Sequence, residues 1–600
     1  MKKTLSFLTL ALLASATASA QMFDVTVGNQ IYHYGSISSE HHPQLEQTIV
    51  NYIQNEGFQI GEKMFPLSES PVFNVINDDT GKVFIEPNKY AAIITYHGDD
   101  VDVEINGNYA SFINVSNDGA HVTVTHIEQA FFPGCDWGPI YILKGQSDNG
   151  SFTLEGDCVY TTIAFDNLTL TNPSGGAITV NNSESTCYYL YGSNTLTDGA
   201  EGKQKAAVYS KGDMYFSAQE EGASLTVNAM STHGISTKGD ISISGGDINV
   251  NAVAKAAKNL KADGDIWIDG GNLTLVSDGG GEWDSEKSKT KSASCIGSDS
   301  NVKISGGTIR LTANGSGGKG ISCDGTFTMT DGELLIDTFG GIYAYVNGRE
   351  YDDYTGNTDR LDSDAKSSPK GIKADGAIEI SGGDIKISTV GNGGEGIESK
   401  EILTVTGGKI YAHTQDDAIN SSSHMYIKGG EITVIATNND GLDANGNLYI
   451  EGGRIMAFGA GSPECGIDAN EEEGYSVYFT GGTLLAVGGG NSVPSQEAST
   501  QAYVSGSGTV TAGSVISVKN GDEVIATFTI PEEYASTGSG NTGGWGGGWG
   551  GGWGPGGSRG GAILVSAPAL VSGSSYTLQN GDSSSTVTAT LRGSGSHRPW

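Results

Sequence analysis

The 600-residue sequence is short of proline and of positive charge. Its 14 Pro argue against a collagen triple helix, which needs abundant proline and a glycine at every third position. Its 33 Lys and Arg stand against 69 Asp and Glu, so the formal net charge is −36. This balance argues against a nucleic-acid partner, because phosphate binding needs clustered Lys and Arg. A surface so rich in carboxylate oxygens attracts cations instead.

Long apolar runs are missing beyond the N-terminus. The marked apolar stretch, residues 5–14, follows Met1-Lys2-Lys3 and precedes Ala18-Ser19-Ala20. A basic start, an apolar centre and a small-residue cleavage site predict a secretory signal peptide over residues 1–20. The stretch is too short to cross a membrane, which takes about 20 apolar residues. We therefore expect a secreted or cell-surface protein without a membrane span, with the periplasm as an alternative location.

Cysteine is scarce and scattered. The sequence has six, and outside the cytoplasm they are free to form disulfides. Their spacing fits neither a disulfide framework nor a zinc site, so buried free thiols and one or two bridges both stay open. The six are Cys135, Cys158, Cys187, Cys295, Cys323 and Cys465.

Glycine is abundant, with 91 residues, while charged residues make up 17%. A chain rich in Gly, Ser, Thr and Asn suits turns and strand surfaces and disfavours helical bundles and coiled coils. One pattern recurs nine times: two short alternating strands joined by a glycine pair or by Asp-Gly, as in AIEISGGDIKIST from Ala377. Its spacing indicates a basic repeat of about 25 residues with loop insertions. The nine turns begin at residues 245, 270, 306, 331, 382, 407, 429, 452 and 481.

A third short segment with an apolar centre precedes each strand pair, such as GIK at 371 and GLD at 441. Three strands per repeat predict an all-β fold, a right-handed parallel β-helix, in which stacked repeats bury a continuous row of Ile, Leu and Val. The alternative is a string of hairpins, because a glycine pair is also a good two-residue hairpin turn.

Four regions follow from these patterns. Residues 1–20 are the signal peptide, and residues 21–90 predict an irregular N-terminal cap with a short helix over residues 44–56. Residues 91–490 predict the parallel β-helix. Residues 491–600 predict a C-terminal strand group that contains a Gly/Trp-rich loop at 538–561.

Stacking the repeats aligns acidic side chains. The residue after each apolar centre includes Glu398, Asn420, Asp443 and Asp468 in successive repeats. Neighbouring strands lie about 4.8 Å apart, so carboxylates at equivalent positions repel each other unless a cation lies between them. Calcium prefers six to eight oxygen ligands, and without a His or Cys cluster zinc is disfavoured. The predicted calcium ligands are Asp416, Asp417, Asn420, Asn439, Asp440, Asp443 and Asp468. Ordinary Asp-Gly turns and hydrogen-bonded Asn ladders are the alternative interpretation.

Aromatic side chains on the insertions and in the Gly/Trp-rich loop are candidate sugar contacts, because the C–H face of a sugar ring packs flat on Trp or Tyr. Buried packing and linker composition would explain them equally well. The candidates are Trp283, Tyr351, Tyr354, Trp545, Trp549 and Trp553.

A catalytic set is harder to assemble. Glycoside hydrolysis needs two carboxylates placed across the scissile bond, and Asp416-Asp417 with Asp440 and Asp443 would have to take that role. A uronate lyase needs a base such as Arg or Lys beside calcium, whereas Arg454 occupies a different face of the repeat from the acidic residues. The sequence therefore favours binding over catalysis.

Several runs resemble a known family: HGISTKGDISISGGDI, DDAINSSSHMYIKGGEITV, NDGLDANGNLYIEGG and ILVSAPALVSGSSYTL. They are similar to secreted carbohydrate-binding β-helix proteins of cellulolytic clostridia and gut Bacteroidetes, over roughly residues 90–590. The resemblance implies a polysaccharide-lyase-like right-handed β-helix that binds calcium and plant cell-wall polysaccharides such as cellulose or pectate. The acidic residues of that family correspond here to Asp416, Asp417, Asp440, Asp443 and Asp468, and Cys465 replaces the acid one repeat further along. The leader also resembles Bacteroidetes secretion signals.

The sequence thus predicts a secreted, monomeric, non-catalytic protein that binds a plant cell-wall or other anionic polysaccharide and holds Ca²⁺ between repeats. A calcium-dependent polyuronate lyase is the first alternative. A structural or adhesive surface protein without a glycan ligand is the second.

Overall fold

The computed structural model describes residues 22–34, 50–53, 57–60, 63–69, 72–76, 91–127, 138–156, 160–495, 497–534 and 561–593. These ranges contain β-strands and short 3-10 helices but no α-helix, and hence no helix that is long and apolar enough to span a membrane. The chain divides into two compact units. The first comprises residues 1–202 and 208–225, and the second comprises residues 203–207 and 226–600.

The first unit begins with antiparallel strand pairs. β1 (Met22–Val27) pairs with β2 (Gln30–Tyr34) and β6 (Val72–Ile76). A separate sheet contains β3 (Val50–Ile53), β4 (Gly57–Ile60) and β5 (Lys63–Pro66), and η1 (Leu67–Glu69) follows. The prediction of a helix over residues 44–56 is wrong for residues 50–53, because Val50, Tyr52 and Ile53 are strand-forming residues that pair with the next strand. The rest of that range lies outside the described residues.

The remainder of the first unit changes to parallel pairing. Two antiparallel hairpins come first, β7 (Ala92–His97) with β8 (Asp100–Asn106) and β9 (Ile113–Asp118) with β10 (Ala120–His126); η3 (Gly107–Tyr109) separates them. Two parallel series follow. The first series contains β11 (Ile140–Ser147), β13 (Thr161–Thr171), β15 (Thr186–Tyr191) and β18 (Met214–Ala218), and β16 (Ser193–Thr197) also pairs with β13. The second contains β10, β12 (Gly150–Glu155) and β14 (Ile178–Val180). The division between the units falls within β17 (Ala206–Ser210) and β19 (Ser224–Ala229).

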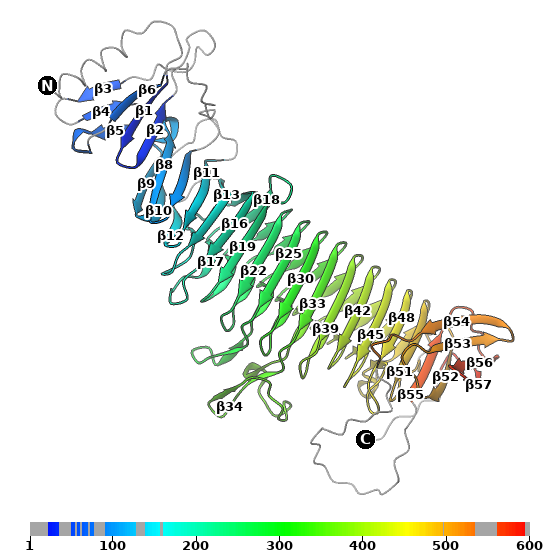
Figure 1. Cartoon of the computed structure of the whole chain (residues 1–600). Coiled ribbons are helices and arrows are strands. Elements are labelled where there is room, and N and C mark those ends of the chain that lie inside the picture. Colours follow the sequence, from blue (N-terminus) through cyan, green and yellow to red (C-terminus); the bar gives the residue numbers. More distant parts are fainter. Residues whose placement is uncertain are drawn as a thin grey trace, which may run out of the picture. The chain divides into compact units, whose positions relative to one another are not determined.

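The second unit contains nine repeats of three strands, which Figure 1 shows as a regular succession of arrows from β22 to β48. The first strands are β20 (His233–Thr237), β23 (Lys258–Ala262), β28 (Ser294–Ser298), β31 (Lys319–Cys323), β37 (Lys370–Ala374), β40 (Glu395–Ser399), β43 (Ile419–Ser421), β46 (Leu442–Ala444) and β49 (Ile467–Ala469). The second strands are β21 (Ile241–Ile243), β24 (Ile266–Ile268), β29 (Val302–Ile304), β32 (Phe327–Met329), β38 (Ile378–Ile380), β41 (Leu403–Val405), β44 (Met425–Ile427), β47 (Leu448–Ile450) and β50 (Val477–Phe479). The third strands are β22 (Asp247–Ala252), β25 (Asn272–Ser277), β30 (Thr308–Ala313), β33 (Glu333–Thr338), β39 (Asp384–Thr389), β42 (Lys409–Thr414), β45 (Glu431–Ala436), β48 (Arg454–Phe458) and β51 (Thr483–Gly488).

Each strand pairs in parallel with its equivalent in the next repeat, as in β41–β44–β47 and β42–β45–β48. This pairing rules out the string of hairpins, in which the two strands flanking a glycine pair would be antiparallel partners. The glycine at the second position of each turn instead bends the chain between two series of parallel strands. Gly408, for example, has φ +82°, and a Cβ there would lie 2.8 Å from the carbonyl oxygen of Gly382 in the preceding repeat. Glycine is therefore the residue that this turn accepts.

The interior of the second unit consists of the apolar residues that alternate along all three strands. Ile397, Leu403 and Ile410 of one repeat are all at most 2% exposed, and so are their equivalents Ile419, Met425 and Ile432. Full burial of such a side chain contributes about 1.5–3 kcal/mol, so the apolar rows are the main source of stability. Cys187, Cys295 and Cys323 are free thiols. Cys465 is buried, and Cys135 and Cys158 lie outside the described residues.

Two insertions and a C-terminal group complete the second unit. A hairpin of β26 (Glu282–Asp284) and β27 (Lys289–Lys291) follows β25. A second insertion, with β34 (Tyr343–Val346), β35 (Arg349–Tyr351), η4 (Ser363–Ala365) and β36 (Lys366–Ser367), follows β33, and η5 (Glu471–Glu473) follows β49. β55 (Gly561–Ser566) pairs antiparallel with β51 and with β52 (Tyr503–Gly508). β54 (Glu523–Thr529), β53 (Val515–Asn520), β56 (Ser575–Asn580) and β57 (Ser583–Thr588) form the last sheet, in that order.

Candidate metal centre

Two columns of polar residues run along the sheet of first strands. Column A holds the residue two positions before each buried apolar centre, and column B holds the residue after it. The strands adopt the register expected from the sequence: Glu398 pairs with Asn420, Asn420 with Asp443, and Asp443 with Asp468. Column A is His233, Lys258, Ser294, Lys319, Lys370, Glu395, Asp417, Asp440 and Cys465, and column B is Ser236, Lys261, Gly297, Ser322, Lys373, Glu398, Asn420, Asp443 and Asp468.

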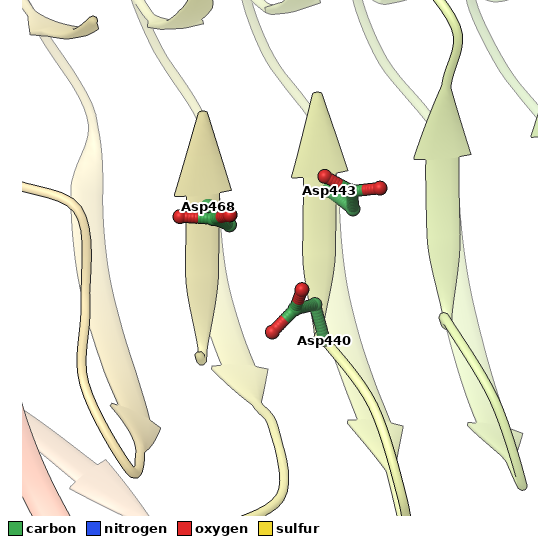
Figure 2. Close-up of side chains that lie close together, drawn as sticks. All are labelled: Asp440, Asp443 and Asp468. Carbon is green, nitrogen blue, oxygen red and sulfur yellow. The ribbon is translucent and has the colours of Figure 1, made fainter. Parts of the chain in front are cut away.

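Three carboxylates converge in the last two repeats. Asp440, Asp443 and Asp468 each place an oxygen within 4.8 Å of the others. Figure 2 shows Asp443 and Asp468 side by side on β46 and β49, with Asp440 just before β46. Asp440 is 9% exposed, and the other two are partly buried. These three of the seven predicted ligands therefore share one small volume.

Asp417 and Asn420 lie in the repeat before this cluster. Asp417 is 6% exposed; its Oδ2 accepts a hydrogen bond of 3.0 Å from the Asn420 amide, and its Oδ1 accepts one of 3.1 Å from the Asp440 backbone N–H. The side-chain carbonyl oxygen of Asn420 is buried and has no hydrogen-bond partner among the described residues. A buried oxygen without a hydrogen-bond donor is destabilising. A cation bound to this oxygen would supply the missing partner.

The remaining two predicted ligands interact with each other. The Asn439 amide donates a 2.7 Å hydrogen bond to Asp416 Oδ1, and both residues are partly exposed. This hydrogen bond joins side chains of two neighbouring repeats. Asp416 and Asn439 therefore lie at the margin of the cluster.

Burial and mutual repulsion disfavour the charged forms of these carboxyl groups. Burial, reinforced by Asp443 and Glu395, raises the pKa of Asp417 to about 9. Burial is also the main cause for Asp440, whose pKa rises to about 8, and for Asp443, whose pKa rises to about 7 with repulsion from Asp468. Protons would neutralise such a cluster at neutral pH unless a cation replaces them.

One repeat earlier, a lysine neutralises the corresponding carboxylates. The Lys370 ammonium lies 2.6 Å from Glu395 and 2.9 Å from Glu398, and it is 7% exposed. These carboxylates raise the pKa of Lys370 against the opposing effect of burial. In the described chain no ammonium or guanidinium nitrogen lies within 4.0 Å of a carboxylate oxygen of Asp417, Asp440 or Asp443. Within the described chain, a lysine thus neutralises the Glu395–Glu398 pair. The aspartates of the next two repeats, Asp417, Asp440 and Asp443, have no such partner there.

The far side of the cluster contains residues that the sequence did not single out as ligands. The Cys465 backbone N–H donates to Asp440 Oδ1, and the Ser492 hydroxyl donates a 2.6 Å hydrogen bond to Asp468 Oδ1. Burial and the nearby Asp468 raise the pKa of Glu464. Ser492 lies outside the repeats, so no periodic pattern could have identified it.

Lysines occupy the other half of the columns. Lys319, 5% exposed, donates to the Gly317 carbonyl and to the Ser367 hydroxyl, and burial lowers its pKa to about 7. The acidic residues that follow column B pair with lysines here: the Lys261 ammonium lies 2.6 Å from Asp299, and that of Lys238 lies 2.6 Å from Asp263. These aspartates are therefore surface ion-pair partners.

Three of the six predicted sugar contacts, all on the insertions, are among the described residues. Trp283 stacks on Tyr345 with ring centroids 4.2 Å apart, so one face of the indole is occupied. Tyr351 is 40% exposed, and its ring contacts Tyr354 edge-on at 5.8 Å. Trp545, Trp549 and Trp553 lie outside the described residues.

Comparison with known proteins places these features in a family. The family model of a carbohydrate-binding domain-containing protein matches residues 118–394 and 388–531. The chain belongs to this family. The second unit, with its repeats and polar columns, thus lies largely within the matched carbohydrate-binding domain residues. Among solved structures, the chain is similar to the polysaccharide lyase-like protein from C. thermocellum, studied as a gadolinium derivative. The two are 21% identical, the match covers 50% of this chain and 96% of that chain, and the TM-score is 0.29. The search of curated proteins found no match.

Proposed function

We propose that this chain is a secreted, non-catalytic polysaccharide-binding protein, a right-handed parallel β-helix with calcium between neighbouring repeats. Its membership of a carbohydrate-binding family supports a glycan partner. The observation that carries the metal proposal is the convergence of Asp440, Asp443 and Asp468 within 4.8 Å, with no lysine of the described ranges in an ion pair with Asp440 or Asp443.

The donor set fits calcium. It consists of oxygens alone, from three carboxylates and from the Asn420 side-chain oxygen that has no partner among the described residues, and calcium prefers six to eight oxygen ligands. The described thiol nearest in sequence, Cys465, contributes its backbone N–H to Asp440. Soft metals such as zinc favour thiolate and imidazole ligands, so the set disfavours them.

Calcium would link the protein to an anionic glycan. An ion held by protein carboxylates on one side retains open coordination positions on the other, which uronate carboxylates or sugar hydroxyls are able to fill. Asp443 and Asp468 are partly exposed, whereas Asp440 is buried. We therefore propose binding of plant cell-wall or similar acidic polysaccharide at this face.

A calcium-dependent polyuronate lyase remains the alternative. Its base would have to lie within about 3–3.5 Å of the reacting carbon, beside the ion. Burial lowers the pKa of two column A lysines, Lys258 and Lys319. Lys319, the nearer of the two to the cluster, belongs to the fourth repeat, whereas Asp440 belongs to the eighth. Four steps of about 4.8 Å separate them by roughly 19 Å. This separation supports binding without cleavage at the acidic columns.

The test combines binding and product analysis. The full chain is incubated with polygalacturonate, alginate and insoluble cellulose, with calcium or with a chelator. Calcium-dependent retention on at least one polysaccharide, without an increase in absorbance from unsaturated products, is the expected result. Absorbance that grows with calcium would establish the lyase instead. Absence of retention on every polysaccharide would leave the structural or adhesive role.

A further inference from the structure

Five aromatic side chains lie on the second strands of the last three repeats or just before them, in the same repeats as the acidic cluster. We call His424, Tyr426, Tyr449, Tyr475 and Tyr478 the aromatic corner. Tyr426, Tyr449 and Tyr478 occupy equivalent positions on β44, β47 and β50. Their ring centroids are 4.6 and 4.7 Å apart, with interplanar angles of 2° and 12°. The rings therefore form a rigid stack along three repeats.

The aromatic corner is continuous with the candidate metal centre. In the eighth repeat, Asp443, Asn445, Asn447 and Tyr449 alternate with the buried residues Ala444, Gly446 and Leu448. The chain bends at Asn445 and Gly446, and β46 and β47 belong to different sheets. One short segment with these four less buried residues therefore leads around the bend from the acidic column to the stack.

His424 has a fixed orientation and an available donor. Its Nδ1 accepts a 2.9 Å hydrogen bond from the Asn447 backbone N–H, so the ring hydrogen is on Nε2. Among the described residues no acceptor takes that hydrogen. Gly446 permits this approach, because a Cβ there would lie 2.6 Å from His424 Nδ1.

Two tyrosines complete the surface. Tyr475, between η5 and β50, is 39% exposed, and its ring meets that of His424 at 5.8 Å and 72°. The Tyr449 hydroxyl accepts a 3.0 Å hydrogen bond from the Asn447 amide, which leaves its own hydrogen to donate. An exposed aromatic ring thus lies beside two oriented hydrogen-bond donors.

We propose that the aromatic corner is a pyranose-binding surface, which rests on the polysaccharide-binding function proposed above. The C–H face of one sugar ring packs on Tyr475, and its hydroxyls accept hydrogen bonds from His424 Nε2–H and from the Tyr449 hydroxyl. Aromatic residues with one apolar face and polar neighbours suit this contact. Trp283 is a poorer candidate, because Tyr345 covers one face of its ring.

The test is affinity electrophoresis of the full chain in gels that contain polygalacturonate, hydroxyethyl cellulose or xylan, with calcium present. Tyr475→Ala should weaken binding to the polysaccharide that retards the wild type by about tenfold, as expected for loss of one aromatic contact. Tyr449→Phe, which keeps the ring stack, should weaken it less. Tyr215→Ala removes a comparably exposed tyrosine, 36%, of β18 and should leave the mobility unchanged.

The outcomes separate this inference from the proposed function. If the wild type binds and Tyr475→Ala and Tyr449→Phe bind equally well, the aromatic corner is not the sugar contact, whereas the polysaccharide-binding function stands. If the wild type binds none of the three polysaccharides, both proposals fail. The rise in melting temperature on adding calcium should be the same in Tyr475→Ala as in the wild type. Loss of this rise would mean that the substitution acts through the acidic columns.

Discussion

Asp443 and Asp468 are register partners on adjacent parallel strands, and an oxygen of each lies within 4.8 Å of the other and of Asp440. Two like charges in this position repel by about 1 kcal/mol in water and by several times more at a partly buried site. The pair therefore costs stability when both residues are ionised without a counter-ion.

Removing one carboxylate should remove the response to calcium. We expect the wild type to gain about 2.7 kcal/mol of unfolding free energy at a calcium concentration roughly 100 times Kd. Asp443→Asn and Asp468→Asn should lose most of this gain, because each deletes an anionic ligand. Thermal melting with calcium and with a chelator provides the measurement. Glu379→Gln, an exposed carboxylate on β38, is the matched control and should keep the full shift.

The metal-free protein should become less stable as the pH rises. The pKa values of Asp417, Asp440 and Asp443 rise to about 9, 8 and 7, whereas an unfolded Asp titrates near 3.9. The folded state thus binds more protons between about pH 4 and 9, so stability falls through that window. Melting temperatures in chelator should be lower at alkaline than at mildly acidic pH. Asp417→Asn should show a shallower pH dependence, and an unchanged slope would contradict the buried acidic cluster.

Lys370 should be a major contributor to the stability of the second unit. Lys370→Met leaves the buried carboxylates of Glu395 and Glu398 without this ion-pair partner, and breaking a buried pair costs about 3–5 kcal/mol. Lys400 also pairs with Glu398 but is 46% exposed, so Lys400→Met should cost less than about 1 kcal/mol. Denaturant unfolding of the two variants measures the difference. Equal losses would mean that the burial of Lys370 has no energetic consequence.

The glycine turns should tolerate no side chain on their second residue. Gly408→Ala places a Cβ on a residue with φ +82° and 2.8 Å from the Gly382 carbonyl oxygen. The backbone conformation alone costs about 1–2 kcal/mol. Gly461→Ala is the control, since no atom lies within 4 Å of its Cβ position. The unfolding midpoint of Gly408→Ala should fall while that of Gly461→Ala stays close to the wild type.

The sequence predicted the repeats and their register because both depend on local periodicity. The glycine pairs and apolar centres recur in every repeat, and the order Glu398, Asn420, Asp443, Asp468 follows directly from their alignment. The all-β class and the parallel strand series were predictable for the same reason.

Contacts between distant or irregular segments were not predictable. The stacking of Trp283 on Tyr345 joins two insertions, and the hydrogen bond from Ser492 to Asp468 comes from outside the repeats, so neither follows a period. Residues 44–56 were predicted as a helix from local pattern alone, although Val50–Ile53 pairs as a strand. The tyrosine stack is periodic, but its residues were not among the predicted sugar contacts.

The antiparallel pairing of β55 on β51 interrupts the parallel series at the last repeat. An exposed parallel edge has a row of unpaired backbone groups. The N-terminal strands of another molecule are able to pair with them. Because β55 occupies that edge in the opposite direction, head-to-tail addition of identical chains is blocked there. A chain truncated after Gly488 would lose this protection and would be prone to grow into fibres.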